Sequence, residues 1–210
     1  MIKKNLKILI LASVAILLPI LVGVILWDRL PARIPVHWNM EGEVDGWSSK
    51  PFAVFGMPLI MLAAQWFAVL MTLADPKNRN HSNKILQLVF WIIPVISVML
   101  GAVTYTSAMG NSVRVEVLVS VFLGVLFVAI GNYLPKCQQS YTIGIKLPWT
   151  LSSEENWSRT HRMAGWIWVV GGIGMMIAGF FGLLWLMLAS ILVMALIPFI
   201  YSYILYRKGV

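Results

Sequence analysis

One segment near the N-terminus gathers side chains that are able to bind a metal ion. Its members are one imidazole and three carboxylates within nine residues, namely His37, Glu41, Glu43 and Asp45. Imidazole and carboxylate groups are common ligands of zinc and related ions. However, the paired-histidine spacing of metalloenzymes is absent, and acids in a loop are usually hydrated. The pattern therefore favours a solvated loop over a surface that meets a peptide partner, and it favours both over a metal site, so we expect no metal.

A second segment has the pattern of a helix start. Ser152 with Glu155 three residues later is a capping box, and Glu155 with Arg159 is an i,i+4 ion pair. We therefore predict a helix that starts at Ser153. It either lies along the membrane interface or runs straight into the next apolar segment.

No catalytic constellation is evident in the sequence. Glu154, Glu155 and His161 share one short segment, but no nucleophile accompanies them. A phosphate-binding glycine loop is also missing. We expect no enzyme, no catalytic residue and no cofactor, while a membrane enzyme that uses His37 or the 154–161 segment remains the alternative.

The composition indicates an integral membrane protein. Of the 210 residues 60% are hydrophobic and only 11% are charged, and the mean hydropathy is +0.83. A soluble domain carries about 25% charged residues. The single cysteine, Cys137, excludes a disulfide scaffold, and we expect it to be a reduced structural thiol. The net charge of +8 does not indicate direct nucleic-acid binding, because the basic residues are spread over the ends of the apolar runs.

Apolar runs predict six membrane-spanning helices. Four runs of about 20 residues cover 8–27, 52–74, 85–107 and 115–134. A stretch of 44 residues without charge, 163–206, has room for two more helices with a turn near 179–182. The predicted fold class is an all-α integral membrane protein with six transmembrane helices.

The distribution of lysine and arginine predicts the orientation. With the N-terminus inside, four basic residues lie in outer loops, namely Arg29, Arg33, Lys50 and Arg114. Twelve lie on the inner side, namely Lys3, Lys4, Lys7, Lys77, Arg79, Lys84, Lys136, Lys146, Arg159, Arg162, Arg207 and Lys208. Basic residues prefer the cytoplasmic side. Both termini are therefore predicted to be cytoplasmic, in a multi-pass protein of a cell membrane.

The span interiors predict helix packing without ion coupling. Apart from Glu116 near one end, they contain no ionisable Asp, Glu, Lys, Arg or His, which argues against an ion-coupled transporter. Gln65 is expected to hydrogen-bond between helices. Close packing is predicted along a line of small residues: Gly171, Gly174, Ala178 and Gly182. Kinks are predicted at four prolines: Pro19, Pro58, Pro94 and Pro198.

Two loops are too long to serve only as connections. The outer loop covers 28–51, and the inner loop covers 135–162. Loops of this length are usually functional or disordered, and both are rich in tryptophan and apolar residues. In the outer loop Ile34, Val36 and Trp38 alternate, so a short strand is expected in a structured cap. The inner loop is also expected to be structured, although a plain anchored connector remains possible.

Motifs in these two loops resemble a known family. The inner loop contains Ile-Gly-Ile-Lys-Leu-Pro-Trp-Thr-Leu at 143–151, preceded by Gly-Asn-Tyr-Leu-Pro-Lys at 131–136 and followed by Thr-His-Arg-Met-Ala-Gly at 160–165. These runs resemble the SdpI/YfhL family of bacterial membrane immunity proteins. The outer loop, with Leu-Pro-x-x-Ile-Pro-x-His-Trp at 30–38, resembles the short module of unknown function that often precedes that region. The resemblance therefore implies two parts, a two-span module over 1–83 and a four-span region over 84–210.

The resemblance implies a function and a set of site residues. Members of the family protect a bacterium from a secreted toxic peptide, and in one arrangement they also hold a cognate transcriptional repressor at the cytoplasmic membrane. The implied toxin-binding residues of the outer loop are His37, Trp38, Glu41, Asp45, Trp47 and Lys50. The implied family-motif residues at the inner side are Asn132, Gly144, Lys146, Pro148, Trp149, Thr150, Trp157, His161 and Arg162. The alternative function is a small-solute or lipid facilitator without ion coupling.

The motif departs from the family at one place. Relatives commonly have Arg-Thr where this chain has Lys146-Leu147. Lysine keeps the charge but cannot form a planar bidentate contact with a carboxylate or phosphate. We expect this chain to bind such a group less specifically.

Overall fold

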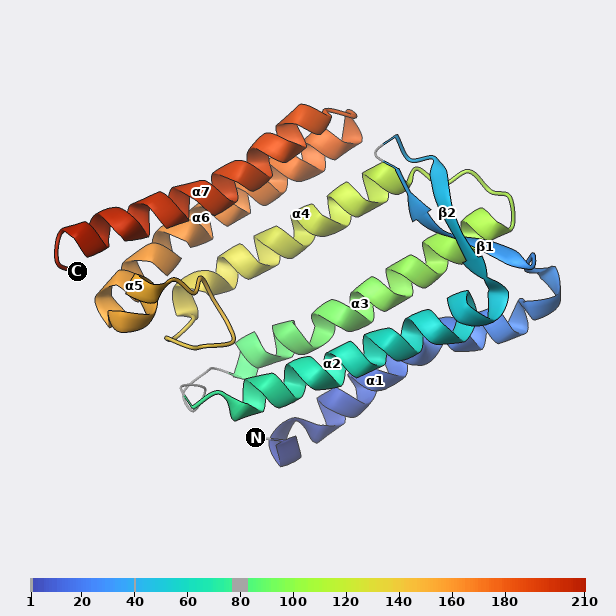
Figure 1. The fold of residues 1–210 in the computed structure, drawn as a ribbon, viewed down its shortest axis with the longest axis horizontal. Coiled ribbons are helices and arrows are strands. Elements are labelled where there is room, and N and C mark those ends of the chain that lie inside the picture. Colours follow the sequence, from blue (N-terminus) through green and yellow to red (C-terminus); the bar gives the residue numbers. More distant parts are fainter. Residues whose placement is uncertain (1, 40, 77–82) are drawn as a thin grey trace. The chain divides into compact units, whose positions relative to one another are not determined.

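The computed structural model describes residues 2–39, 41–76 and 83–210 (Figure 1). The first half contains α1 (Ile2–Ile25), η1 (Trp27–Arg29), β1 (Arg33–Trp38), β2 (Val44–Ser49), the π-helical turn η2 (Phe52–Gly56), α2 (Met57–Ala74) and α3 (Asn83–Ala108). The second half contains α4 (Val115–Tyr133), η4 (Leu134–Lys136), α5 (Pro148–Ser152), α6 (Glu154–Phe180) and α7 (Leu184–Arg207). Lys77 and Arg79, which the charge count assigns to the inner side, lie outside the described residues.

Six helices in the described part of the chain have the length and apolar composition needed to cross a membrane. This confirms the prediction of a six-span all-α membrane protein. The fifth span begins earlier than its apolar run, because α6 starts at Glu154 and continues without interruption to Phe180. Of the two alternatives for the helix after Ser152, the continuous one is therefore correct.

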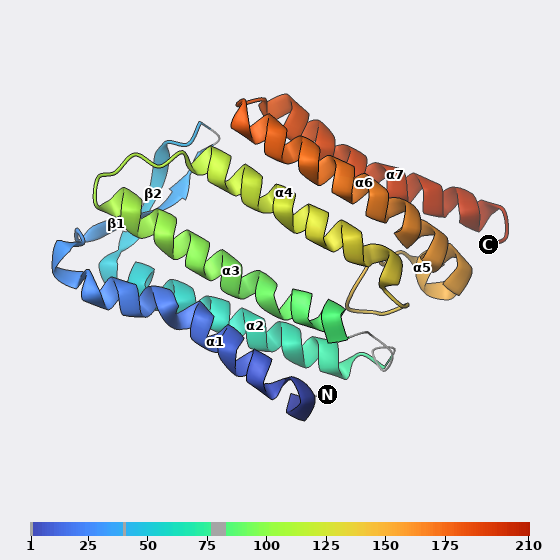
Figure 2. The same cartoon turned by 180° about the vertical axis from the view of Figure 1, so that it is seen from behind.

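The helices form two compact units. Unit 1 comprises Met1–Met71 and Leu86–Val115, and unit 2 comprises Thr72–Ile85 and Glu116–Val210. In unit 1, α1, α2 and α3 lie side by side, with the strands at one end (Figure 1, Figure 2). The third span thus packs with the first two. The predicted modules, 1–83 and 84–210, divide the chain by sequence rather than by packing, and that boundary stays a prediction.

Pro94 shows how the helices of unit 1 accommodate proline. It lies inside α3 and has no N–H, so the carbonyl of Phe90, four residues earlier, loses its helical donor. The side chain of Gln65 on α2 donates from Nε2 to this carbonyl at 3.0 Å, and Gln65 is only 3% exposed. The predicted interhelical role of Gln65 is confirmed.

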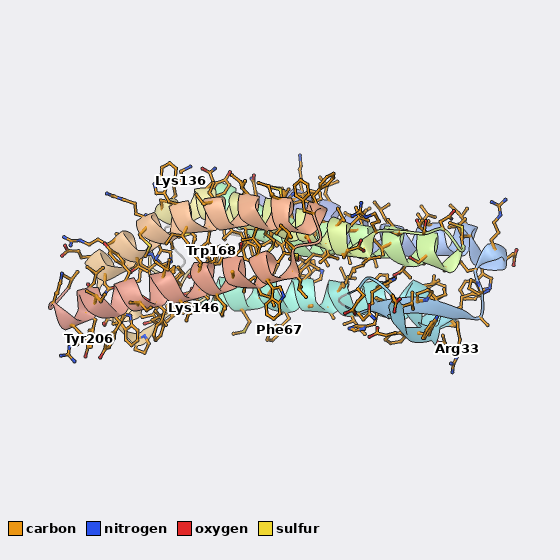
Figure 3. All side chains as sticks on the ribbon, turned by 90° about the horizontal axis from the view of Figure 1, so that it is seen from above. Arg33, Phe67, Lys136, Lys146, Trp168 and Tyr206 are labelled. Atoms are coloured by element: carbon orange, nitrogen blue, oxygen red, sulfur yellow. The ribbon has the colours of Figure 1, made fainter. Side chains whose placement is uncertain are left out.

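The same arrangement occurs at Pro198 in unit 2. Pro198 lies inside α7, and it leaves the carbonyl of Met194 without its helical donor. Trp168 on α6, labelled in Figure 3, donates from Nε1 to that carbonyl at 3.0 Å. In a membrane, where water is absent, a freed carbonyl needs a donor of this kind.

Pro19 in α1 is contacted by three successive turns of α3. Ser97 donates to the carbonyl of Ile16 at 2.8 Å, and Tyr105 donates to the carbonyl of Pro19 at 2.8 Å. Between them lies Gly101, where an added Cβ would be 2.7 Å from the Cβ of Pro19. The spacing of four residues places all three on one face of α3.

Pro58 differs from the other three prolines. It is the second residue of α2 and directly follows the π-helical turn η2. A π turn makes wider, i→i+5 hydrogen bonds and is frequent at functional sites. The irregularity in this span is the π turn over Phe52–Gly56, and the kink predicted at Pro58 stays a prediction.

Glycines bring α4 and α6 into close contact in unit 2. Gly165, Gly172 and Gly179 recur every seven residues on α6. A Cβ on Gly172 would lie 2.6 Å from the carbonyl oxygen of Gly124, and one on Gly165 would lie 2.8 Å from that of Gly131. Only glycine permits two helix backbones to approach this closely.

The predicted line of small residues on α6 mainly faces α7. A Cβ on Gly171 would lie 2.7 Å from Met194 of α7, and Ala178 is fully buried. Gly182, however, has a φ of +69° in the turn between α6 and α7, with nothing near its missing Cβ. Its inclusion in the packing line is wrong, because it ends the helix in the left-handed conformation that glycine adopts.

The bond from Gln65 to Phe90 yields a testable prediction. Replacing Gln65→Leu should destabilise the protein by about 0.6–1.7 kcal/mol, since it leaves a buried carbonyl without a donor. Pro94→Ala restores the helical N–H that Phe90 lacks, so the same Gln65→Leu change should cost less in a Pro94→Ala background. Unfolding free energies of the four proteins in mixed micelles would measure this coupling. Equal costs in both backgrounds would contradict the assignment.

Candidate functional site

The predicted outer loop is a two-stranded antiparallel hairpin built on the helix ends of unit 1. Strands β1 and β2 pair with Arg33 opposite Ser49 and Trp38 opposite Val44. The strand expected from the alternation of Ile34, Val36 and Trp38 is confirmed as β1. The hairpin is held by Ile34, which is fully buried, in a cluster with Leu30, Ala53, Val54 and Tyr105.

The exposed face of the hairpin carries charged and aromatic side chains. His37 Nδ1 lies 2.5 Å from Asp45 Oδ1, and these side chains are 70% and 45% exposed. Gly46 pairs with His37 across the strands and leaves room for it, because an added Cβ would lie 2.8 Å from the His37 Cβ. Trp47, on the same strand, is 55% exposed. The hairpin thus presents an exposed aromatic ring on the strand that also carries the hydrogen bond between His37 and Asp45.

Other predicted outer-loop residues have different surroundings. Lys50 is directed towards the protein, because its Nζ donates to the carbonyl of Trp27 at 3.0 Å and lies 5.2 Å from the centre of that indole. Trp38 is half-buried, and Glu41 is exposed in the turn. The side chain of Asn39 shapes this turn by accepting from the N–H of Glu41 and of Glu43. Within the described residues no three His, Cys, Asp or Glu side chains gather as metal ligands would.

The inner loop is fastened by a carboxylate that the sequence analysis missed. Asp75 follows α2 and is 7% exposed. One of its oxygens, Oδ2, accepts four hydrogen bonds: from Ser140 Oγ (2.6 Å), from the N–H of Tyr141 (2.9 Å) and Thr142 (3.0 Å), and from Thr142 Oγ1 (2.9 Å). The sequence did contain an indication of this role. A carboxylate at the C-terminal end of a helix is unfavourable with respect to the helix dipole, so its presence there indicates a stabilising partner elsewhere.

A stacked tryptophan and histidine form the centre of the loop. Trp157 and His161 stack with ring centres 4.0 Å apart, and both are about 1% exposed. His161 Nε2 accepts from the N–H of Ile145 at 2.9 Å, while Nδ1 bonds the carbonyl of Trp157 at 2.8 Å. These two bonds assign the ring proton to Nδ1. Gly144 has a φ of +115°, and a Cβ there would lie 2.6 Å from His161 Nε2.

The Pro-Trp-Thr run forms the short helix α5. Pro148 is its first residue, a position that does not need an N–H. Thr150 is fully buried; its Oγ1 accepts from the N–H of Leu147 and is 2.9 Å from the carbonyl of Ile145. Trp149 Nε1 donates to Ser202 of α7 at 2.9 Å. Its ring also contacts three aromatic rings of α7: Phe199, Tyr203 and Tyr206.

The predicted helix cap is displaced by one residue. The N-cap of α6 is Ser153, whose side chain accepts from the N–H of Asn156, whereas Ser152 bonds back to the carbonyl of Trp149. The reason is α5, which extends through Ser152. The predicted pair of Glu155 with Arg159 is confirmed at 2.6 Å.

The family-motif residues separate into buried and exposed groups. Gly144, Thr150, Trp157 and His161 belong to the internal network just described, and Pro148 and Trp149 hold α5. The exposed members are Asn132, Lys146, Pro148 and Arg162. Lys146 Nζ donates to the carbonyl of Thr142 at 3.3 Å. The structure does not bring Glu155 and His161 into one catalytic site, because the carboxylate pairs with Arg159 while the imidazole is buried.

Two further observations concern reactivity and internal space. Burial raises the pKa of the Cys137 thiol to about 11, so the group stays protonated near neutral pH. A small pocket in unit 1, beside Pro19 and Thr104, has a volume of about 10 Å³. That is room for about one water molecule. This pocket offers no passage for a solute.

The Asp75 network yields a second prediction. Asp75→Ala removes the acceptor of two backbone N–H groups, so the amides of Tyr141 and Thr142 should exchange hydrogen faster, by the equivalent of about 1–3 kcal/mol. Hydrogen exchange followed by mass spectrometry measures this directly. The matched control is Asp28→Ala, which removes an exposed carboxylate. Unchanged exchange at 141–142 in the Asp75 variant would contradict the assigned role.

Comparisons with known proteins give matches over the two segments that contain the structured loops. Residues 14–62 match a domain of unknown function (DUF1648), and residues 136–202 match the SdpI/YfhL protein family. The chain is 26% identical over 209 residues to the protein named "Immunity protein SdpI" of Bacillus subtilis (strain 168), covering 98% of this chain and 97% of that one. No solved structure matches significantly. The chain is a multi-pass membrane protein, and its resemblance to the SdpI/YfhL family is confirmed.

Proposed function

We propose that this protein gives its bacterium resistance to a secreted toxic peptide. The observation that carries the proposal is the correspondence, over nearly the full length of both chains, with a protein named an immunity protein. The correspondence includes both loops, so the features described above fall within the shared region. An immunity role needs no catalytic centre, and the hairpin and the fastened loop are two separate candidate binding surfaces.

The hairpin is the proposed toxin-binding surface. Trp47 offers a large exposed ring on the same strand as Asp45, which is hydrogen-bonded to His37. Tryptophan is enriched among residues that dominate binding energy. The buried contacts of Ile34 hold the hairpin on the helix ends, so little ordering is needed before a peptide binds. In this proposal Lys50 and Trp38 stabilise the hairpin and do not contact the peptide directly.

The inner loop is the proposed contact for a cytoplasmic repressor. Helix α2 follows the hairpin through the π turn, and Asp75 comes directly after α2. The residue that fastens the inner loop is therefore joined to the hairpin by one continuous helical segment. We propose that toxin binding alters the inner loop along this segment. The exposed Lys146 is then available to a partner with a carboxylate or another anionic group.

The toxin-binding proposal is tested by Trp47→Ala in cells that are sensitive to the toxic peptide. The loss of a central tryptophan should weaken binding by about 2 kcal/mol or more, so protection should fall at least tenfold in the toxin dose tolerated. Ser49→Ala, on the same exposed face, is the matched control. Membrane levels of each variant are measured by immunoblot. Full protection by Trp47→Ala at normal levels would sink the proposal.

The signalling proposal is tested separately by pull-down of the repressor in the presence of toxin. Lys146→Gln should reduce capture of the repressor while protection is retained, because Lys146 lies outside the buried network. Lys208→Gln, another exposed lysine of the predicted inner side, is the control and should leave capture unchanged. Equal capture by the wild type and Lys146→Gln would exclude this residue as the contact.

A further inference from the structure

A groove between α6 and α7 has no role in the function proposed above. It has a volume of about 600 Å³ and lies in unit 2, where α6 and α7 run side by side (Figure 1, Figure 2). Its lining is polar at one end and apolar at the other: Ser158, Arg159, Arg162, Met163 and Trp166 from α6, and Tyr201 from α7.

The polar end of the groove carries an uncompensated positive charge. Arg159 pairs with Glu155 at 2.6 Å, so these two charges offset each other. Arg162 is exposed, and the described residues give it no acidic partner. A guanidinium presents several donors in a plane and is suited to bidentate binding of a phosphate. The hydroxyls of Ser158 and Tyr201 line the same groove and are able to donate as well.

The apolar end continues along the lipid-facing side of α6. Trp166 is 73% exposed, and it is followed by Val170 (66%), Ile173 (44%) and Ile177 (50%). Their spacing of four, three and four residues places them in one stripe of the helix. This stripe lies inside the predicted span, where a water-soluble partner has no access. The apolar stripe therefore favours a ligand with a hydrocarbon chain.

We propose that this groove binds an anionic phospholipid. The phosphate would lie at Arg162, at the predicted inner membrane interface, and an acyl chain would follow the stripe from Trp166. Basic pockets between transmembrane helices on the cytoplasmic side are suited to acidic headgroups. The tryptophan lies where the headgroup region meets the hydrocarbon, which is the position that this residue prefers.

The test uses the full-length protein in detergent micelles, with bound lipid counted by native mass spectrometry. Phosphatidylglycerol and phosphatidylcholine are titrated separately. The wild type should bind phosphatidylglycerol in preference, and Arg162→Gln should weaken that binding about fivefold while leaving phosphatidylcholine unchanged. Arg162→Lys should lie between the two, because it keeps the charge and loses the planar donors. Trp166→Ala should weaken both lipids.

Controls separate the groove from general charge and from folding. Lys208→Gln removes an exposed positive charge near the end of α7 and should leave the lipid preference intact. Circular dichroism and the melting temperature verify that each variant is folded. Unchanged phosphatidylglycerol binding by folded Arg162→Gln would overturn the proposal. Displacement of the lipid by an equal concentration of inorganic phosphate would overturn it too, in favour of a soluble anion. Neither result depends on immunity.

Discussion

The structure depends on the requirement that every backbone carbonyl inside a membrane has a hydrogen-bond donor. Proline removes such a donor, and three spans contain one in their interior. At two of them a side chain of a neighbouring helix donates to the carbonyl that proline leaves without a donor, Gln65 at Pro94 and Trp168 at Pro198, whereas at Pro19 Ser97 and Tyr105 donate to the nearby carbonyls of Ile16 and of Pro19 itself. Each such bond specifies which helix is the neighbour and at what height it packs. The hydrogen bonds at the prolines therefore help to select the neighbouring helix and its position. Apolar contacts alone do not, because a helix gains nearly the same energy from apolar contact with lipid as with another helix.

In the inner loop, backbone groups find their hydrogen-bond partners in buried side chains rather than in a helix. Much of the segment between η4 and α5 lacks regular secondary structure. Several of its backbone N–H groups donate to three buried acceptors: the carboxylate of Asp75, the ring of His161 and the hydroxyl of Thr150. A family motif that looks like a binding sequence is thus largely the internal support of the loop. The surface that it offers to a partner is limited to its exposed residues, namely Asn132, Lys146, Pro148 and Arg162.

The sequence predicted those features that rest on strong and regular patterns. Six spans, the strand at Ile34 and the pair of Glu155 with Arg159 follow from hydropathy or spacing, and all are present. The position of Asp75 at a helix C-terminus indicated an acid with a role, but its partners at 140–142 were not predictable, because they lie about 65 residues away in the chain. The close approach of Gly172 to Gly124 was missed for a similar reason. Several glycine spacings on α6 were equally compatible with packing, and only the position of α4 selects among them. The N-cap of α6 is Ser153 rather than Ser152, because Ser152 is the last residue of α5. No local rule specifies the length of α5.

The five glycines of α6 also bear on how the protein is made. Glycine is about 1 kcal/mol less favourable than alanine in a helix, and this span also begins with two acids and two arginines. During synthesis the segment is therefore the one least able to enter the bilayer unaided. The next segment, α7, follows after a turn of three residues and has no charge before Arg207. Insertion of the two as a joined pair, with Gly171 and Gly174 covered by α7 and Gly172 by α4, would let a weak span cross the membrane.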